Sequence, residues 1–325
     1  MATPNSAVSE IIATTLKNRG PKIIDNVSKN NGILKALKAA GNIKEADGGE
    51  TIFEPLEFTE NGTFGWYSGY DTLDISPSEV LTGAEFDWKQ CSVAVSMSGL
   101  EQLKNSGSSR LHDLLAARVK NAEHTMENNL VTGVYSDGTG TGGKQLAGLQ
   151  ALIPDDPTAG TVGGISRVTY SWWRTKKFAG VVDGGAAVSS ANIQSYMHRL
   201  YLPMVRGNEN DYVIAADDNY YRLYLESLTS IQRISSDEEA QAGYRRLMYQ
   251  GAKVICDGSY GGACPANHMY FVNARFTKLR PHKDRNMVPI GGEREATNQD
   301  AFVKLLGWAG AMTISNGFTQ GVLIA

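Results

Sequence analysis

A glycine-rich segment at residues 138–144 is the chain's nearest match to a nucleotide-binding motif. It reads Gly-Thr-Gly-Thr-Gly-Gly-Lys, close to the phosphate-binding loop Gly-x-x-x-x-Gly-Lys-Ser/Thr. Gln145 stands where that motif needs a hydroxyl for magnesium, and a helix rather than a strand is predicted before the loop. We therefore interpret the segment as a connector after a helix and expect no nucleotide there.

Thiols and histidines are the other candidates for chemistry. Cys256, Cys264 and His268 could supply zinc ligands, but their spacing matches no common zinc site, and isolated buried thiols are the commoner alternative. The sequence contains no Gly-x-Ser-x-Gly elbow and no His-Glu-x-x-His motif. The residue types thus predict no catalytic site, no metal and no cofactor. Three scattered cysteines fit a reducing compartment.

Charge is distributed unevenly along the chain. Residues 45–87 contain eleven carboxylates and no Lys or Arg, so this window contributes −11 to a total of −3 and the remainder sums to +8. The same window is rich in aromatic and aliphatic residues, which acidic disordered tails lack. An acidic, aromatic segment beside a basic remainder indicates a segment that lies on another copy of the chain.

The acidic window is predicted to form an extended hairpin. Residues 51–60 and 86–97 have the composition of strands, Pro55 marks the first as an edge strand, and Asn61-Gly62 is a turn signal. A lone hairpin is marginal in water and needs a surface to lie on. That surface could be the hairpin's own domain or a neighbouring subunit, and the charge asymmetry favours the neighbour.

The hairpin contacts are predicted to combine apolar burial with charge. Burying half the area of four aromatic side chains gives on the order of 10 kcal/mol before ordering costs, at ~25 cal/mol/Å². Exposed ion pairs add about 0–1 kcal/mol each and set register. The predicted hairpin contacts are Glu54, Glu57, Phe64, Trp66, Tyr67 and Tyr70. The predicted basic acceptors on the neighbour are Arg174, Lys176, Lys177, Lys278, Arg280, Lys283 and Arg285.

The elements around the hairpin follow from periodicity and capping signals. Short helices are predicted within residues 1–44, and Ser98 with Glu101 forms a capping box. A long helix with an apolar stripe is predicted at 110–135. Further helices are predicted at 190–202, at 218–228 and from Ser236, and strands at 212–215, 252–256, 269–272 and 312–315, with a buried strand closing the sequence.

This order of arm, hairpin, long helix, glycine loop and α/β body resembles the major capsid proteins of tailed bacteriophages. Those proteins have the Hong Kong 97-type fold. The matching stretches follow the same order over nearly the whole chain, and they are specific jointly although each is weak. They lie at residues 49–57, 65–70, 118–123, 135–138, 143–149, 162–167, 172–174, 298–300 and 308–310.

The resemblance implies an α+β Hong Kong 97-type fold with five parts. They are an N-terminal arm (1–47), an extended hairpin loop (48–97), a peripheral domain with a spine helix (98–149), a mainly axial domain (150–300) and closing strands (301–325). It also implies a structural protein rather than an enzyme. Its copies would form the hexamers and pentamers of an icosahedral phage head around double-stranded DNA, assembled in the bacterial host cytoplasm.

Two departures from the family pattern refine this expectation. Only about 48 residues precede the hairpin, so we expect a separate scaffolding protein rather than a removable N-terminal segment. No lysine lies between Lys44 and Lys89, so the hairpin tip cannot supply the amine of an isopeptide bond, and locking is expected to be non-covalent. The other expected partners are a portal and the packaged DNA, with a cement protein left open and no membrane.

Two rival interpretations stay open from the sequence. One is an encapsulin-type shell of a cellular nanocompartment, which would have the same fold and hold a cargo enzyme. The other is a soluble α/β hydrolase or transferase, which the missing catalytic motifs argue against.

Overall fold

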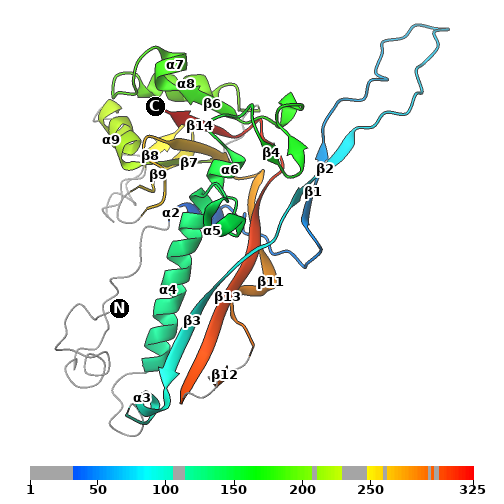
Figure 1. Cartoon of the computed structure of the whole chain (residues 1–325). Coiled ribbons are helices and arrows are strands. Elements are labelled where there is room, and N and C mark those ends of the chain that lie inside the picture. The colour runs from blue at the N-terminus through cyan, green and yellow to red at the C-terminus, as the bar shows by residue number, and fades with distance from the viewer. Residues whose placement is uncertain are drawn as a thin grey trace.

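The computed structural model describes residues 32–104, 114–206, 211–228, 247–258, 262–291, 294–295 and 300–325. The predicted helix from Ser236, and the part of the predicted arm before residue 32, lie outside this range. The chain forms an upper lobe around a six-stranded sheet and a long lower lobe in which one helix runs along a second sheet. The hairpin projects from the side of these lobes (Figure 1). This projecting hairpin is the arm, and it is distinct from the predicted N-terminal arm.

The lower lobe is organised by its longest strand. Its strands are β3 (Lys89–Ser98), β11 (Thr277–Pro289), β12 (Arg294–Glu295) and β13 (Ala301–Ile314). All pairs are antiparallel, with β11 and β12 following one another along β13 and β3 also paired to it. Helix α4 (Leu114–Tyr135) packs on β3 and β13. Ala122, Met126, Leu130 and Val134 are buried at four-residue spacing, which confirms this part of the predicted stripe.

The upper lobe is a mixed sheet with the order β6-β14-β10-β7-β9-β8. Its strands are β6 (Lys176–Ala179), β7 (Tyr212–Ala216), β8 (Leu247–Tyr249), β9 (Ala252–Cys256), β10 (Met269–Asn273) and β14 (Gly321–Ile324). Every residue of the central strands β7 and β10 is buried, because alternate residues of β7 belong to two core clusters, with Val213 and Ala215 in one and Tyr212, Ile214 and Ala216 in the other. Helices α7 (Gly180–Gly184), α8 (Ile193–Tyr201) and α9 (Asp218–Ser227) flank it. The strands predicted at 212–215, 252–256 and 269–272 and the closing strand are confirmed.

The arm is a separate two-stranded ribbon that ends in a loop. Strand β1 (Ile52–Glu57) pairs antiparallel with β2 (Leu81–Phe86), and residues 58–80 between them form no regular structure. Strand β3 at 89–98 confirms most of the strand predicted at 86–97. Its predicted role as the return strand of the hairpin is wrong, because β2 returns the ribbon and β3 belongs to the lower sheet. A continuous period-two pattern concealed this change of partner, since alternation does not identify the neighbouring strand.

Short elements complete the two lobes and the segments between them. They are α2 (Gly32–Ala39), α3 (Gly99–Lys104), α5 (Gly140–Gly143), α6 (Leu149–Leu152), β4 (Thr161–Val162), β5 (Ile165–Ser166) and a 3₁₀ turn at Ser171–Trp173. The predicted capping box is confirmed: Glu101 N–H donates to Ser98 Oγ at 3.3 Å, and Ser98 N–H donates to Glu101 Oε2 at 3.1 Å. Buried Asp257 accepts from the Tyr135 hydroxyl at 2.7 Å and from Gly32 N–H at 3.2 Å, which joins α4 to the start of α2.

Candidate functional site

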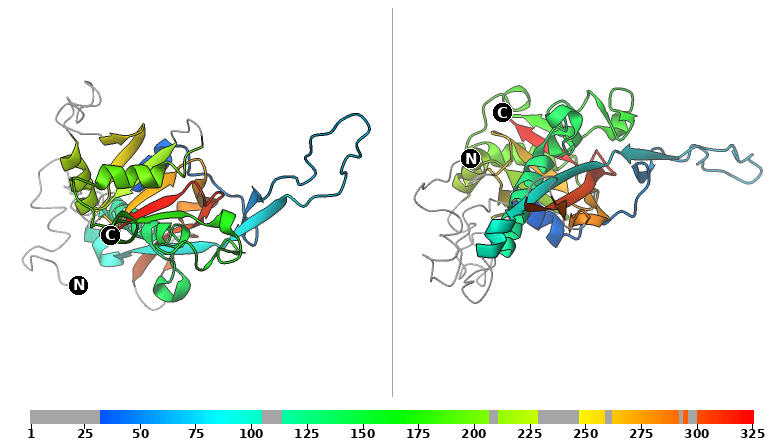
Figure 2. Two further views of the ribbon diagram at one scale, coloured as in Figure 1. Left: turned by 90° about the horizontal axis from the view of Figure 1, so that it is seen from above. Right: turned by 60° about the horizontal axis from the view of Figure 1, so that its bottom comes forward.

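The outer loop of the arm exposes large apolar side chains. Trp66 is 94% exposed, Tyr70 106% and Ile75 91%, and the arm extends clear of both lobes in every view (Figure 2). The rings of Phe64 and Trp66 contact each other, with centroids 5.7 Å apart. Several large exposed apolar side chains on one segment are typical of interaction surfaces. Leu73 and Ile75 are also exposed on this loop, although they were not among the predicted contacts. Their position within the acidic, apolar window of residues 45–87 is the sequence feature that could have pointed to them.

Local polar turns shape the loop without burying it. Asn61 Oδ1 accepts from Thr63 N–H at 3.1 Å, and Asp71 Oδ2 accepts from Ser68 N–H at 2.8 Å. The hydroxyl and the backbone N–H of Ser76 donate to Asp74, which lowers the pKa of that carboxyl. These hydrogen bonds between neighbouring residues shape the loop locally. The loop conformation therefore does not depend on packing of the exposed rings against the same molecule.

The base of the arm is bound to the body through one face of the ribbon. Ile52, Leu56, Ala84 and Phe86 are buried in the main core. Glu54 lies on the same face, with only 6% of its side chain exposed. The buried face of the ribbon therefore contains apolar side chains and one carboxylate.

Glu54 binds the basic strand β11 of its own chain. Its Oε1 lies 2.7 Å from Arg280 Nη1 and 3.1 Å from Thr313 Oγ1, and its Oε2 lies 3.2 Å from Lys278 Nζ. This carboxylate is buried and paired within the chain, and its predicted contact with a neighbour stays a prediction. Lys278 and Arg280 are likewise engaged by Glu54 within the chain, and their predicted role as acceptors for a neighbour's hairpin also stays a prediction. Residues more than 220 positions apart meet here, which no local pattern reveals.

The remaining basic candidates are only partly engaged within the chain. Lys283 Nζ lies 3.3 Å from Asp47 Oδ1 at the exposed surface. Arg174 donates to the carbonyls of Arg167 and Val168, and Lys176 Nζ lies 3.9 Å from the centre of the Phe318 ring. The two others, Lys177 and Arg285, and the predicted hairpin carboxylate Glu57 form no ion pair within the described residues. These cations stay predicted acceptors.

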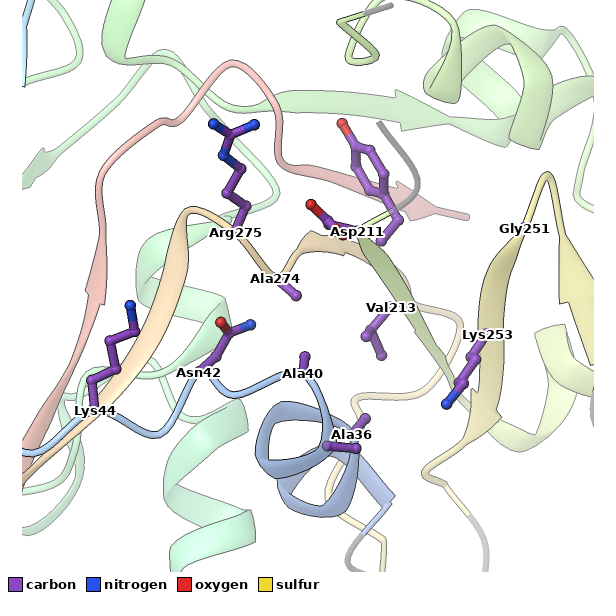
Figure 3. A pocket seen from close by; sticks show the side chains of 12 residues that line it. Ala36, Ala40, Asn42, Lys44, Asp211, Val213, Gly251, Lys253, Ala274 and Arg275 are labelled. Atoms are coloured by element: carbon purple, nitrogen blue, oxygen red, sulfur yellow. The ribbon is translucent and has the colours of Figure 1, made fainter. Parts of the chain in front are cut away.

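A cavity of about 420 Å³ lies between helix α2 and the upper sheet (Figure 3). Lys44, Lys253 and Arg275 line it together with Asp211, and the buried amide Nδ2 of Asn42 has no hydrogen-bond partner there. The three cationic side chains point in different directions and do not meet at one point (Figure 3). The cavity therefore lacks the convergent donors of a phosphate or carboxylate site.

The motifs considered for chemistry do not form a reactive centre. Residues 140–143 form a tight turn after α4, and the carbonyl of Gly143 accepts from Lys89 Nζ at 2.9 Å. Burial raises the pKa of the Cys264 thiol, which keeps it protonated and a poor ligand. Within the described ranges no three His, Cys, Asp or Glu residues are placed to hold a metal, and no helix is long and apolar enough to span a membrane.

Comparison with known proteins identifies the fold. No protein-family model and no curated protein matches the sequence. The capsid of cyanophage A-1(L) matches with a TM-score of 0.68 and 18% identity, covering 95% of this chain and 96% of that one. The capsid of an empty GTA particle matches with 0.61 and 12% over 99% of both chains. The capsid of Myoviridae phage XM1 matches with 0.55 and 14%, over 95% and 97%. The chain has the fold of phage capsid proteins, and the predicted Hong Kong 97-type fold is confirmed.

Proposed function

We propose that this chain is a major capsid protein of the tailed-phage type, whose copies form hexamers and pentamers of an icosahedral shell around double-stranded DNA. The observation that carries the proposal is the arm, whose loop exposes Trp66, Tyr70 and Ile75 while its base is firmly packed. The shared fold with phage capsid chains supports the same conclusion. In this role the chain is structural, located in the virion and assembled in the host cytoplasm.

The arm would bind a neighbouring copy mainly by apolar burial. Half-burial of the four rings at Phe64, Trp66, Tyr67 and Tyr70 contributes on the order of 10 kcal/mol per contact, less the cost of ordering the loop. The carboxylates still exposed on the arm, such as Glu57 and Asp71, would then pair with Lys and Arg side chains of the neighbouring subunit. These pairs would set the register of the arm on that subunit. In the proposed hexamers and pentamers every subunit both gives and receives an arm, and such head-to-tail contacts form a ring when the rotation between subunits closes.

The lock would be non-covalent, because the sequence between Lys44 and Lys89 contains no lysine. Boiled, denatured particles should therefore run as a monomer of about 35 kDa, the mass of the chain. A ladder of larger species would contradict this. A separate scaffolding protein and a portal are the further partners that such a shell would use, and a decoration protein is left open.

Imaging of the purified chain tests the proposal. Wild-type protein, with a scaffolding protein if required, should elute as megadalton particles and appear as shells by negative stain. The double variant Trp66→Ala, Tyr70→Ala should lose them, while Tyr170→Ala, which removes a part-exposed ring of the body, should keep them. A stable monomer with the arm folded onto its own body would overturn the proposal. Shells that hold a protein cargo and no DNA would favour the nanocompartment instead.

A further inference from the structure

Directional contacts hold the chain on both sides of the ribbon β1–β2, and fewer hold the ribbon itself. Residues 42–46 form backbone hydrogen bonds along β11, and β3 pairs with β13 from Lys89 onward. Among the described strands, β1 and β2 form a sheet of their own. The ribbon's own backbone reaches the body at Glu85, whose N–H donates to the carbonyl of Gly163 at 3.1 Å. The buried apolar face around Ile52, Leu56 and Phe86 also attaches the ribbon. Apolar burial is non-directional, so this face alone would tolerate tilting and sliding of the ribbon.

Glu54 adds direction at the centre of that face. It lies between Ile52 and Leu56 on β1, and its two carboxylate oxygens receive three donors from two other strands, β11 and β13. Arg280 and Lys278 approach from β11 at 2.7 and 3.2 Å. Charge-assisted hydrogen bonds of this length require defined geometry. A shift of the ribbon by one residue would replace the carboxylate with Phe53 or Pro55 and leave two cations unpaired.

We propose that Glu54 is the positioning residue that sets the direction in which the arm leaves the body. The buried carboxylate and its three donors act as a clasp (Glu54, Lys278, Arg280 and Thr313) that holds the ribbon in one register and one orientation before any neighbour is met. The consequence for assembly rests on the proposed function: an arm of fixed direction is already oriented toward its acceptor surface before binding. The exposed loop then supplies the contact area, and the clasp fixes the orientation of the arm.

Distance measurements between spin labels test the clasp. Labels at Tyr70→Cys on the loop and Val182→Cys on α7, both exposed positions, report the angle of the arm in a background with the three native cysteines replaced. Labelled chains are diluted into unlabelled protein, so that each distance lies within one chain. The wild-type distribution should be narrow, and Glu54→Gln should broaden it at least twofold. Glu57→Gln, on the exposed face of the same strand, is the matched control and should leave it narrow.

Further variants and results test whether Glu54 sets the direction of the arm. Equal widths for wild type, Glu54→Gln and Glu57→Gln would overturn the proposal. If Glu54→Gln does not fold, Thr313→Val removes one donor and should broaden the distribution to a lesser extent, and an unchanged width there would overturn it equally. Trp66→Ala should weaken the shells without changing the width of the distance distribution. Broadening in a chain that forms no shells would leave the clasp standing and refute only the capsid function.

Discussion

The projecting arm and the six-stranded sheet are opposite solutions to the placement of apolar side chains. In the sheet, β7 and β10 bury all their residues, and aromatic side chains such as Tyr201, Tyr249 and Phe271 pack edge to face within the lobe. In the arm, Trp66 and Tyr70 have almost no protein around them. The sheet is therefore stabilised by its own core, whereas the loop of the arm can gain comparable burial only from another molecule.

Because of this difference, the free energy of folding of the chain and the free energy of association of its copies depend on different residues. A single melting curve of particles would not separate them. Folding of the chain depends on the lobes, and cohesion of the particle depends on the loop. Substitutions should therefore fall into two groups, one that lowers the free energy of unfolding of the chain and one that weakens only the assembled form.

The largest effect should come from the core of the upper sheet. Phe271→Ala removes a ring with no exposed surface at the centre of β10 and leaves a cavity. The free energy of unfolding should fall by about 3–5 kcal/mol, measured by denaturant titration of the dispersed chain. A loss below about 1 kcal/mol would show that this sheet does not carry the stability of the lobe.

Removing one ring from the loop should have the next largest effect, confined to the particle. Trp66→Ala should weaken each contact between copies by about 3 kcal/mol, from half-burial of a large ring at ~25 cal/mol/Å². The dispersed chain should unfold within about 0.5 kcal/mol of wild type, as for exposed sites generally. Calorimetry of particles and of dispersed chains measures both values. Particles of unchanged thermal stability would count against the docking of this loop.

A smaller effect should appear in the lower lobe, at the capping box. Ser98→Ala should cost about 1 kcal/mol of chain stability, because it removes the hydroxyl that accepts from Glu101 N–H.

The same capping box should make stability depend on pH. The hydrogen bond from the Arg118 guanidinium, 3.0 Å away, is the main reason that the pKa of Glu101 is lowered below its ordinary value of 4.5. A lowered carboxyl pKa in the folded state adds stability that is complete above that ordinary value and is lost as the pH falls through the lowered pKa. Glu101→Gln should therefore flatten the acid limb of a stability–pH profile. An unchanged acid limb would refute the role of this pair.

The smallest effect should come from an exposed carboxylate of the arm. Glu57→Gln should leave chain stability within about 0.5 kcal/mol of wild type. It should reduce particle stability by at most ~1 kcal/mol, and only at low salt, since exposed ion pairs are weak and screened. Particle melting in low and high salt measures this. A large loss at high salt would mean that Glu57 is buried in the assembled form.

Much of the fold was predictable because local signals were strong. Strand β9 occupies the predicted 252–256, and the capping box at Ser98 was recognisable from two residues three positions apart. Helix α8 begins at Ile193 instead of the predicted 190, because Asn192 Oδ1 accepts from Ser189 N–H and these residues form a turn before the helix. Element boundaries of this kind depend on single side-chain contacts.

The long-range pairings could not be predicted. Local patterns anticipated only the end of β13, at 312–315, because its middle contains Gly307, Trp308 and Gly310 and lacks an alternating pattern. Glu54 was predicted to contact a neighbouring copy, but within the chain it pairs with Lys278 and Arg280 of β11. Sequence complementarity does not say whether two segments meet within one molecule or between two, so the remaining predicted contacts of the arm stay predictions.

The position of β14 has a consequence for the timing of synthesis. This strand lies between β6 and β10, and β6 leaves the ribosome more than 140 residues earlier. At ~5–20 residues per second, the edge of β6 stays open for on the order of ten seconds, and the edge of β10 for about a few seconds. The upper lobe therefore cannot close during translation until residues 321–324 emerge, and a chain that stalls earlier is left with exposed edges that favour aggregation over incorporation.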